Sequence, residues 1–102
     1  GNLAPVLKLI EKNLSSGKDW QNFKEAFDNA DQDFLKNLKN MHPSLTHNDL
    51  KFCAYLRLNL TSKEIAPLLN ISIKSVEIKR YRLRKKLKLE SEKNLTDYIM
   101  SL

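Results

Sequence analysis

Glycine and proline are scarce in this chain, which has two glycines and three prolines among its 102 residues. These residues mark tight turns and interrupt helices, so few turns are signalled. Helix-forming leucine, lysine and glutamate are plentiful instead. With 41% hydrophobic residues, the chain is long enough for one small core and does not have the composition of a disordered segment. We therefore expect an all-α fold.

Cysteine and long apolar runs are also lacking. Cys53 is the one cysteine, so no internal disulfide can form, and its neighbours Leu50, Phe52 and Leu56 predict a buried core thiol. No apolar run approaches the roughly 20 residues that cross a bilayer, and no signal peptide opens the chain. A soluble, cytoplasmic protein without membrane contact is expected. The first residue, Gly1, suggests a fragment of a longer protein that would carry the input portion.

Catalytic and metal-binding patterns are missing as well. Residues 15–18 (Ser-Ser-Gly-Lys) lack the spacing of a Walker phosphate loop, and no nucleophile is accompanied by a base. His42 and His47 have no companion ligands at metal spacing, so surface histidines are expected. The sequence predicts no enzymatic activity, no metal site and no cofactor.

Positive charge is concentrated in one short segment. Between Lys74 and Lys88 there are eight basic residues and one acid, Glu77, a sum of +7 against +6 for the whole chain. Residues 1–44, in contrast, carry six basic and six acidic side chains. One basic helix on a near-neutral body is the pattern expected where a polyanion docks.

Three short helices are predicted within residues 1–44. The first covers residues 5–14, Asp19 is expected to cap the second, and Asp31 to cap a third that stops before Pro43. Their apolar positions fall at helical steps and are Trp20, Phe23, Ala26, Phe27 and Ala30, then Phe34, Leu35, Leu38 and Met41. This aromatic seam favours a packed core over a ligand site.

Two further helices are predicted to begin at capping boxes. Thr46 with Asp49, and Thr61 with Glu64, have the required three-residue spacing. The first helix is expected to run to about Leu58. The second buries Ile65, Leu68 and Leu69 and places the small Ala66 at a helix crossing. Pro67 conflicts with a helix interior by about 3 kcal/mol, so this helix should either bend at Ala66 or be shorter.

A tight turn and a basic helix follow. Asn70 is placed where a left-handed residue is often needed, and Ser72 can cap the next helix. The interval from Ala66 through Asn70 to Val76 suits two helices that cross over a short turn. The buried stripe of the basic helix is Val76, Leu83 and Leu87. A last helix is expected over residues 92–100, and it could either pack on the domain or form a dimer contact through Leu95, Tyr98, Ile99 and Leu102.

Five short segments correspond to segments of a known family, in the same order, although not every residue is identical. They are Leu45-Thr46 with Asp49, Lys63 to Ala66, Leu69 with Ile71-Ser72, Ser75 to Glu77, and Lys86-Leu87. In these segments residues 45–89 resemble the DNA-binding domain of LuxR/NarL-type response regulators of bacterial two-component systems. The resemblance implies a four-helix domain, residues 45–102, whose third helix enters the major groove and whose fourth often dimerises. Residues 1–44 would then be a helical extension or linker region.

The chain also departs from this family. Glu77 replaces a usual lysine, Lys79 replaces a histidine, and Arg80, Arg82 and Arg84 enrich the helix in arginine. This version resembles a variant at the C-terminus of sensor-regulators in Bacteroidetes-type bacteria. The base preference of better-known relatives cannot be transferred.

The expected DNA contacts divide into two groups. Phosphates would be bound by basic side chains and by free amides at Ser72 to Ser75, at the start of the recognition helix, about residues 73–87. The basic side chains are Lys63, Lys74, Lys79, Arg82, Lys85 and Lys86. By family position, Glu77, Ile78 and Tyr81 would read bases, with glutamate accepting from cytosine and isoleucine meeting a thymine methyl. Alternatively, Glu77 pairs with Arg80 or Tyr81 along the helix.

Two arginines are doubtful as DNA contacts. Arg80 lies four residues after Val76, near the inner stripe, so we expect it to bind an internal carboxylate such as Glu64 or Asp49. Arg84 is left open between a structural role and a DNA contact.

The function indicated is sequence-specific binding of double-stranded DNA by the output domain of a bacterial transcriptional regulator. The protein would act as a homodimer through its last helix or its N-terminal helices, and RNA polymerase is a further candidate partner. One alternative is a domain like region four of a sigma factor. Another is a protein-interaction module in which Trp20, Phe23, Phe27 and Phe34 form a partner groove.

Overall fold

The computed structural model describes residues 19–102, which form six α-helices joined by turns and contain no strand. The helices are α2 (Asp19–Ala30), α3 (Phe34–Met41), α4 (His47–Arg57), α5 (Ser62–Leu69), α6 (Ile73–Lys86) and α7 (Leu95–Ser101). The expected all-α fold is confirmed, with four helices after residue 45. The helix expected over residues 5–14 lies outside the described residues. Within residues 19–102 no helix is both long and apolar enough to cross a membrane.

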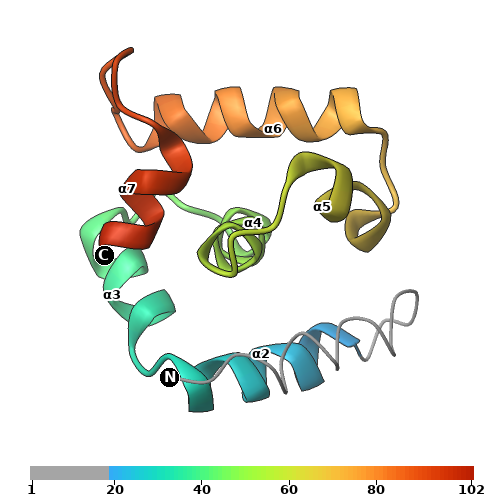
Figure 1. The fold of residues 1–102 in the computed structure, drawn as a ribbon. Coiled ribbons are helices and arrows are strands. Elements are labelled where there is room, and N and C mark those ends of the chain that lie inside the picture. The colour runs from blue at the N-terminus through green and yellow to red at the C-terminus, as the bar shows by residue number, and fades with distance from the viewer. Residues whose placement is uncertain (1–18) are drawn as a thin grey trace.

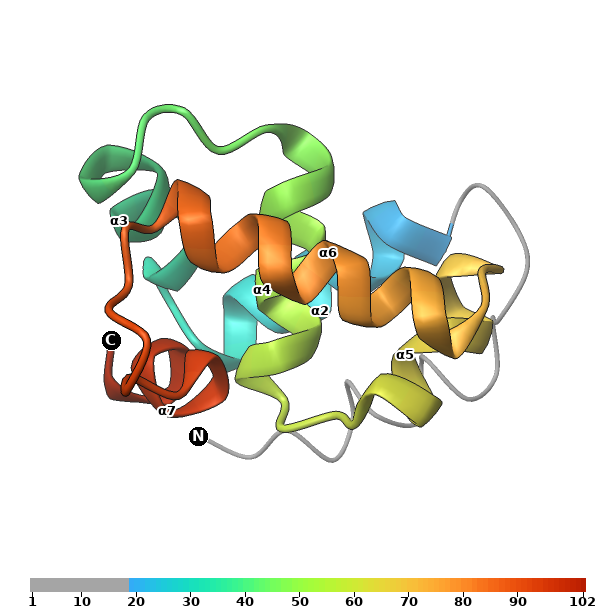
Figure 2. The same cartoon turned by 90° about the horizontal axis from the view of Figure 1, so that it is seen from above.

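Helix α4 is central to the arrangement (Figure 1). Helix α6 crosses it on one side and α2 lies on the other, an order that the perpendicular view also shows (Figure 2). Helix α5 packs against α6, and α7 packs mainly on α4. The N-terminal helices therefore leave the outer side of α6 uncovered.

The core is a single cluster that draws side chains from all six helices. Phe23, Phe27 and Phe34 are all buried, and successive ring centroids in this series lie 5.8 and 5.9 Å apart. The predicted aromatic core is confirmed for these three residues, so they cannot form an open partner groove. The side chain of Trp20 lies outside the described part. Cys53 is buried as expected, and burial, assisted by the charge of Asp49, raises the pKa of its thiol to about 12.

The predicted helix starts are confirmed at three positions. Thr46 and Asp49 form a complete capping box, as do Thr61 and Glu64. The hydrogen bonds from the Thr61 backbone and side chain lower the pKa of Glu64. Ser72 caps α6 by accepting the Ser75 N–H at 3.1 Å. These local signals act within one turn of helix, which is why the sequence predicts them well.

Two predicted N-terminal caps are wrong. Helix α2 begins at Asp19 itself, so Asp19 is helical rather than the preceding cap. Helix α3 is preceded by Asp33, which has a left-handed φ of 68° and makes no side-chain cap, while Asp31 binds Arg57 instead. Met41, expected on the buried stripe, is 53% exposed because it lies in the last turn of α3, beyond the packed residues.

Helix α5 continues through Pro67 to Leu69, so the expectation of a shorter helix is wrong. The Pro67 side chain is exposed, and its carbonyl accepts the Asn70 N–H at 3.3 Å. The predicted left-handed turn is confirmed, since Asn70 has φ 56° and ψ 45°.

Helix α7 is shorter than predicted. It begins at Leu95, after Asn94 accepts the Asp97 N–H, rather than near Glu92. Leu95 and Ile99 are buried, and Tyr98 and Leu102 pack against the same core. Of the two roles left open for this face, packing on the domain is the one that the structure shows.

Candidate nucleic-acid interface

The turn between α5 and α6 is rigidly specified. The Ile71 N–H donates to Ala66 O at 3.0 Å, which requires the left-handed conformation that Asn70 supplies. Two residues later the Ser72 cap starts α6. The orientation of α6 on the protein is therefore fixed by local hydrogen bonds as well as by packing.

Helix α6 has an inner and an outer face. Successive residues are about 100° apart around a helix, so Val76, Leu83 and Leu87 share one side, and all three are buried. The opposite side consists of Lys74, Ile78, Tyr81 and Lys85, all exposed. Since α2 lies beyond α4, this outer face is directed away from the body of the protein (Figure 1).

The outer face combines cations with large side chains. Ile78 is 43% exposed and Tyr81 is 59% exposed. Lys85 Nζ lies 4.7 Å from the centroid of the Tyr81 ring, a cation–π contact that holds both side chains near the helix. Glu77 is exposed and makes no ion pair or side-chain hydrogen bond with any residue of 19–102, so pairing with Arg80 or Tyr81 is not seen.

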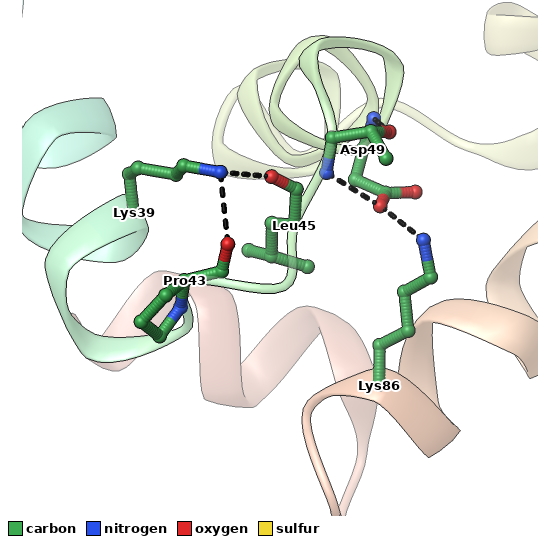
Figure 3. Close-up of polar contacts among 6 residues, drawn as sticks. Lys39, Pro43, Leu45, Asp49 and Lys86 are labelled. Atoms are coloured by element: carbon green, nitrogen blue, oxygen red, sulfur yellow. Dashed lines mark hydrogen bonds and ion pairs between the residues drawn. The ribbon is translucent and has the colours of Figure 1, made fainter.

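One flank of α6 faces the start of α4. A hollow of about 240 Å³ opens between the two helices. Its cationic lining is Lys79, Arg82 and Lys86, and the residues contributed by α4 and its cap include Thr46, Asn48 and Asp49. Lys86 Nζ lies 2.5 Å from Asp49 Oδ2 (Figure 3). Three cations against one carboxylate leave the hollow positively charged.

Asp49 is held in its ionised form. Burial acts to raise the pKa of its carboxyl, but the hydrogen bonds from Lys86 and Thr46 together outweigh this and leave the pKa below its ordinary value. The ion pair with Lys86 is therefore present throughout the neutral range.

The other flank of α6 faces α7. Arg80 Nη2 donates to Thr96 Oγ1 at 3.0 Å. Arg84 donates to the carbonyls of Lys93 and Glu90, the latter at 2.8 Å. The prediction that Arg80 binds an internal carboxylate is wrong, because Glu64 is engaged by its own cap and Asp49 by Lys86. Arg80 thus joins α7 to α6, and Arg84 joins the loop before α7 to α6.

The remaining predicted residues lie near the start of the helix pair. Lys63 on α5 and Lys74 on α6 are exposed. Ser75 is half-buried, and both its N–H and its hydroxyl bond to Ser72, so its amide is not free for a phosphate.

Within residues 19–102, no group of three His, Cys, Asp or Glu side chains lies close enough together to bind a metal ion. His42 is not the expected surface histidine, since it is half-buried and its Nε2 lies 2.9 Å from Tyr98 Oη. His47 is exposed, as expected.

Sequence reasoning missed two polar contacts around the α4 cap. Lys39 donates to backbone carbonyls before α4, and Asp49 binds Lys86 besides capping its own helix. Lys39 had no sequence signal, since it looked like one more exposed lysine. Asp49 was expected to cap its helix and was a possible partner of Arg80, but neither expectation identified Lys86, 37 residues away, as its partner.

A comparison with protein families bears on this arrangement. The sequence model of the bacterial regulatory proteins of the LuxR family matches residues 43–99, which include all of α4, α5 and α6 and most of α7. Comparisons with curated proteins and with solved structures give no match. The family match spans more than half of the chain and the whole surface just described. The chain belongs to the LuxR family of bacterial regulatory proteins and carries the DNA-binding helix-turn-helix domain of that family.

Proposed function

We propose that the protein binds specific sequences of double-stranded DNA by inserting α6 into the major groove, as the output domain of a bacterial response regulator in the cytoplasm. The observation that carries the proposal is the exposed outer face of α6, which has a lysine at each end and is not covered by α2. A helix presented in this way fits the width of the major groove. The family match supports DNA binding in general.

Phosphate binding is assigned to the cations on and beside α6. Lys74 and Lys85 lie on the outer face, while Lys79, Arg82 and Lys86 line the hollow toward α4. Lys63 extends this set from α5. Each neutralised phosphate releases counterions, so affinity should fall steeply with salt.

Base reading is assigned to Glu77, Ile78 and Tyr81. All three are exposed, with Glu77 and Ile78 on the first half of α6, where recognition helices reach base edges, and Tyr81 one turn further along. Because no residue of 19–102 pairs with the Glu77 carboxylate, we assign it to accept a hydrogen bond from cytosine N4. Ile78 offers an apolar contact for a thymine methyl.

Two copies would bind two half-sites as a homodimer. The face of α7 made of Leu95 and Ile99 is buried within one protomer, so the contact would use another surface of α7 or of the N-terminal helices. RNA polymerase is a candidate partner of the DNA-bound protein.

The test is a titration against duplexes selected from a random pool, at several salt concentrations. Lys79→Ala and Arg82→Ala should weaken all duplexes alike and reduce the magnitude of the salt slope by about one each. Glu77→Ala should instead change which duplex is preferred, by about 1–3 kcal/mol of discrimination.

Lys24→Ala is the matched control, since it removes one positive charge from α2, the helix on the far side of α4 from α6 (Figure 1). Weak binding without a salt slope would favour a protein partner instead of DNA. Unchanged preference in Glu77→Ala would remove that residue from base reading.

A further inference from the structure

Lys39 lies on α3, outside the segment that matches the family, yet it contacts the connection that leads into the DNA-binding domain. Its Nζ donates to Pro43 O at 2.9 Å and to Leu45 O at 2.5 Å (Figure 3). One ammonium thus binds two carbonyls of the short loop between α3 and α4. The loop is closed further by the Leu45 N–H, which donates to His42 O at 3.1 Å.

The carbonyl of Leu45 and the N–H of Thr46 belong to the same peptide group. Lys39 binds the oxygen of this peptide, and Asp49 Oδ2 accepts its N–H at 2.9 Å. Because the peptide is planar with its oxygen and hydrogen on opposite sides, rotating it would break both contacts at once. Lys39 therefore helps to aim the Thr46 N–H at the Asp49 carboxylate.

The same oxygen of Asp49 holds Lys86. Asp49 Oδ2 lies 2.5 Å from Lys86 Nζ, so a continuous chain of polar contacts runs from α3 to the last turn of α6. Linked hydrogen bonds of this kind polarise and strengthen one another. The chain of contacts ends at the cationic hollow formed with Lys79 and Arg82.

The contact with Asp49 holds the ammonium group of Lys86 in a defined position. Its side chain is 39% exposed, and an ammonium has three donors, of which Asp49 engages one. A free lysine loses up to about 2 kcal/mol of rotamer freedom when it is immobilised. Placing the ammonium in advance reduces that loss when a phosphate arrives.

We propose that Lys39 is a positioning residue for DNA binding, which acts through the peptide between Leu45 and Thr46 and through Asp49 to place Lys86 for a DNA phosphate. The proposal rests on the proposed function. It makes α3, which precedes the family domain, part of the device that sets DNA affinity.

The test compares Lys39→Met with Lys36→Met in duplex titrations. Lys36 is an exposed lysine of the same helix, and its loss removes the same charge without touching the loop. Lys39→Met should weaken binding about three- to tenfold more than Lys36→Met, the size of one charge-assisted contact. Lys39→Arg, which keeps two donors for the carbonyls, should restore most of the affinity.

The decisive measurement repeats the comparison in a Lys86→Met background. If Lys39 acts through Lys86, the difference between Lys39→Met and Lys36→Met disappears there. Lys39→Met should also reduce the magnitude of the salt slope by up to about one, although Lys39 itself contacts no phosphate. Thermal unfolding of each variant shows whether the titrated protein is folded.

Three results would overturn the proposal. They are an equal effect of Lys39→Met in both backgrounds, no difference between Lys39→Met and Lys36→Met, and tighter binding by Asp49→Asn. The last would show that Asp49 competes with phosphate for Lys86 instead of placing it. If the parent chain binds no duplex at all, the proposed function itself fails, an outcome distinct from these three.

Discussion

At the scale of single residues, Asp49 has the most consequences. Its carboxylate caps α4, holds Lys86, and adds to the effect of burial that raises the pKa of Cys53. These roles coincide because the start of α4, the end of α6 and the core around Cys53 lie close together. A change at this one side chain is therefore expected to affect stability and DNA binding separately.

Stability should fall on acidification partly through Asp49 and Glu64, whose pKa values are both lowered in the folded protein. A carboxyl of this kind binds protons more readily when unfolded, so its contribution is present above the unfolded pKa and is lost as the pH falls through the folded one. Asp49→Asn should lower the free energy of unfolding by about 1 kcal/mol at neutral pH. The free energy of unfolding of this variant should then decrease less on acidification than that of the parent chain. Urea denaturation midpoints, measured at a series of pH values from neutral to acidic, report both the loss at neutral pH and the pH dependence.

Asp97→Asn is the control for this comparison. Its side chain makes no hydrogen bond or ion pair within residues 19–102. This variant should keep the acid dependence of the parent chain. If Asp49→Asn does so too, the carboxylate is not stabilising the fold through its charge.

At the scale of helices and turns, predictability follows the range of the interaction. The capping boxes at Thr46 and Thr61, the cap at Ser72 and the left-handed Asn70 are encoded within four residues, and all were predicted. The start of α3 could not be predicted, because the Asp31 side chain binds Arg57, 26 residues away, instead of capping the helix. Prediction from local sequence fails where a residue far away in the sequence binds the side chain that was expected to form the cap.

The same distinction applies to the candidate interface. Helical periodicity was enough to predict the buried stripe through Val76 and thus the outward face of α6. It could not assign the flanks, since the partners of Arg80, Arg84 and Lys86 come from the start of α4 and from the segment around α7. The DNA contacts themselves stay predictions.

Asn70 provides a test of the turn. Its backbone is left-handed, which costs roughly 1–2 kcal/mol for residues with an ordinary Cβ and nothing for glycine. Asn70→Ala should lower the free energy of unfolding by about 1 kcal/mol, whereas Asn70→Gly should be close to neutral. Chemical denaturation of the three proteins measures the difference. Equal losses in both variants would mean that the Asn70 side chain, not its conformation, is what the turn requires.

At the scale of the whole molecule, Arg57 joins parts that the sequence places far apart. Its Nε donates to Asp31 between α2 and α3, and its Nη1 donates to the carbonyls of Ile99 and Met100 in α7. The guanidinium also lies 4.6 Å from the centroid of the Phe34 ring. The division at residue 44 stays a prediction, but these contacts cross it. We expect the two parts to unfold together.

Arg57→Met tests this expectation. The Arg57 and Asp31 side chains are only 18% and 24% exposed, so losing the guanidinium leaves a partly buried carboxylate and two carbonyls without their donor, at a cost of about 2 kcal/mol. The chain has one tryptophan and one cysteine, and each reports on one side of residue 44. Unfolding is followed by the fluorescence of Trp20 in α2 and by chemical labelling of Cys53 in α4.

Both probes should show one denaturant midpoint in the parent chain, and both midpoints should fall equally in Arg57→Met, because coincident transitions are the mark of a single cooperative unit. Lys36→Met, which removes a positive charge from α3 without breaking a contact to α4 or α7, should leave both midpoints in place. The contrary result has two parts: the Trp20 fluorescence changes at a lower denaturant concentration than Cys53 labelling, and Arg57→Met does not shift the midpoint of the labelling. It would show that the N-terminal helices unfold independently of the rest of the protein. In that case Lys39 could influence Lys86 only while α3 is docked, and DNA affinity would depend on whatever docks or releases it.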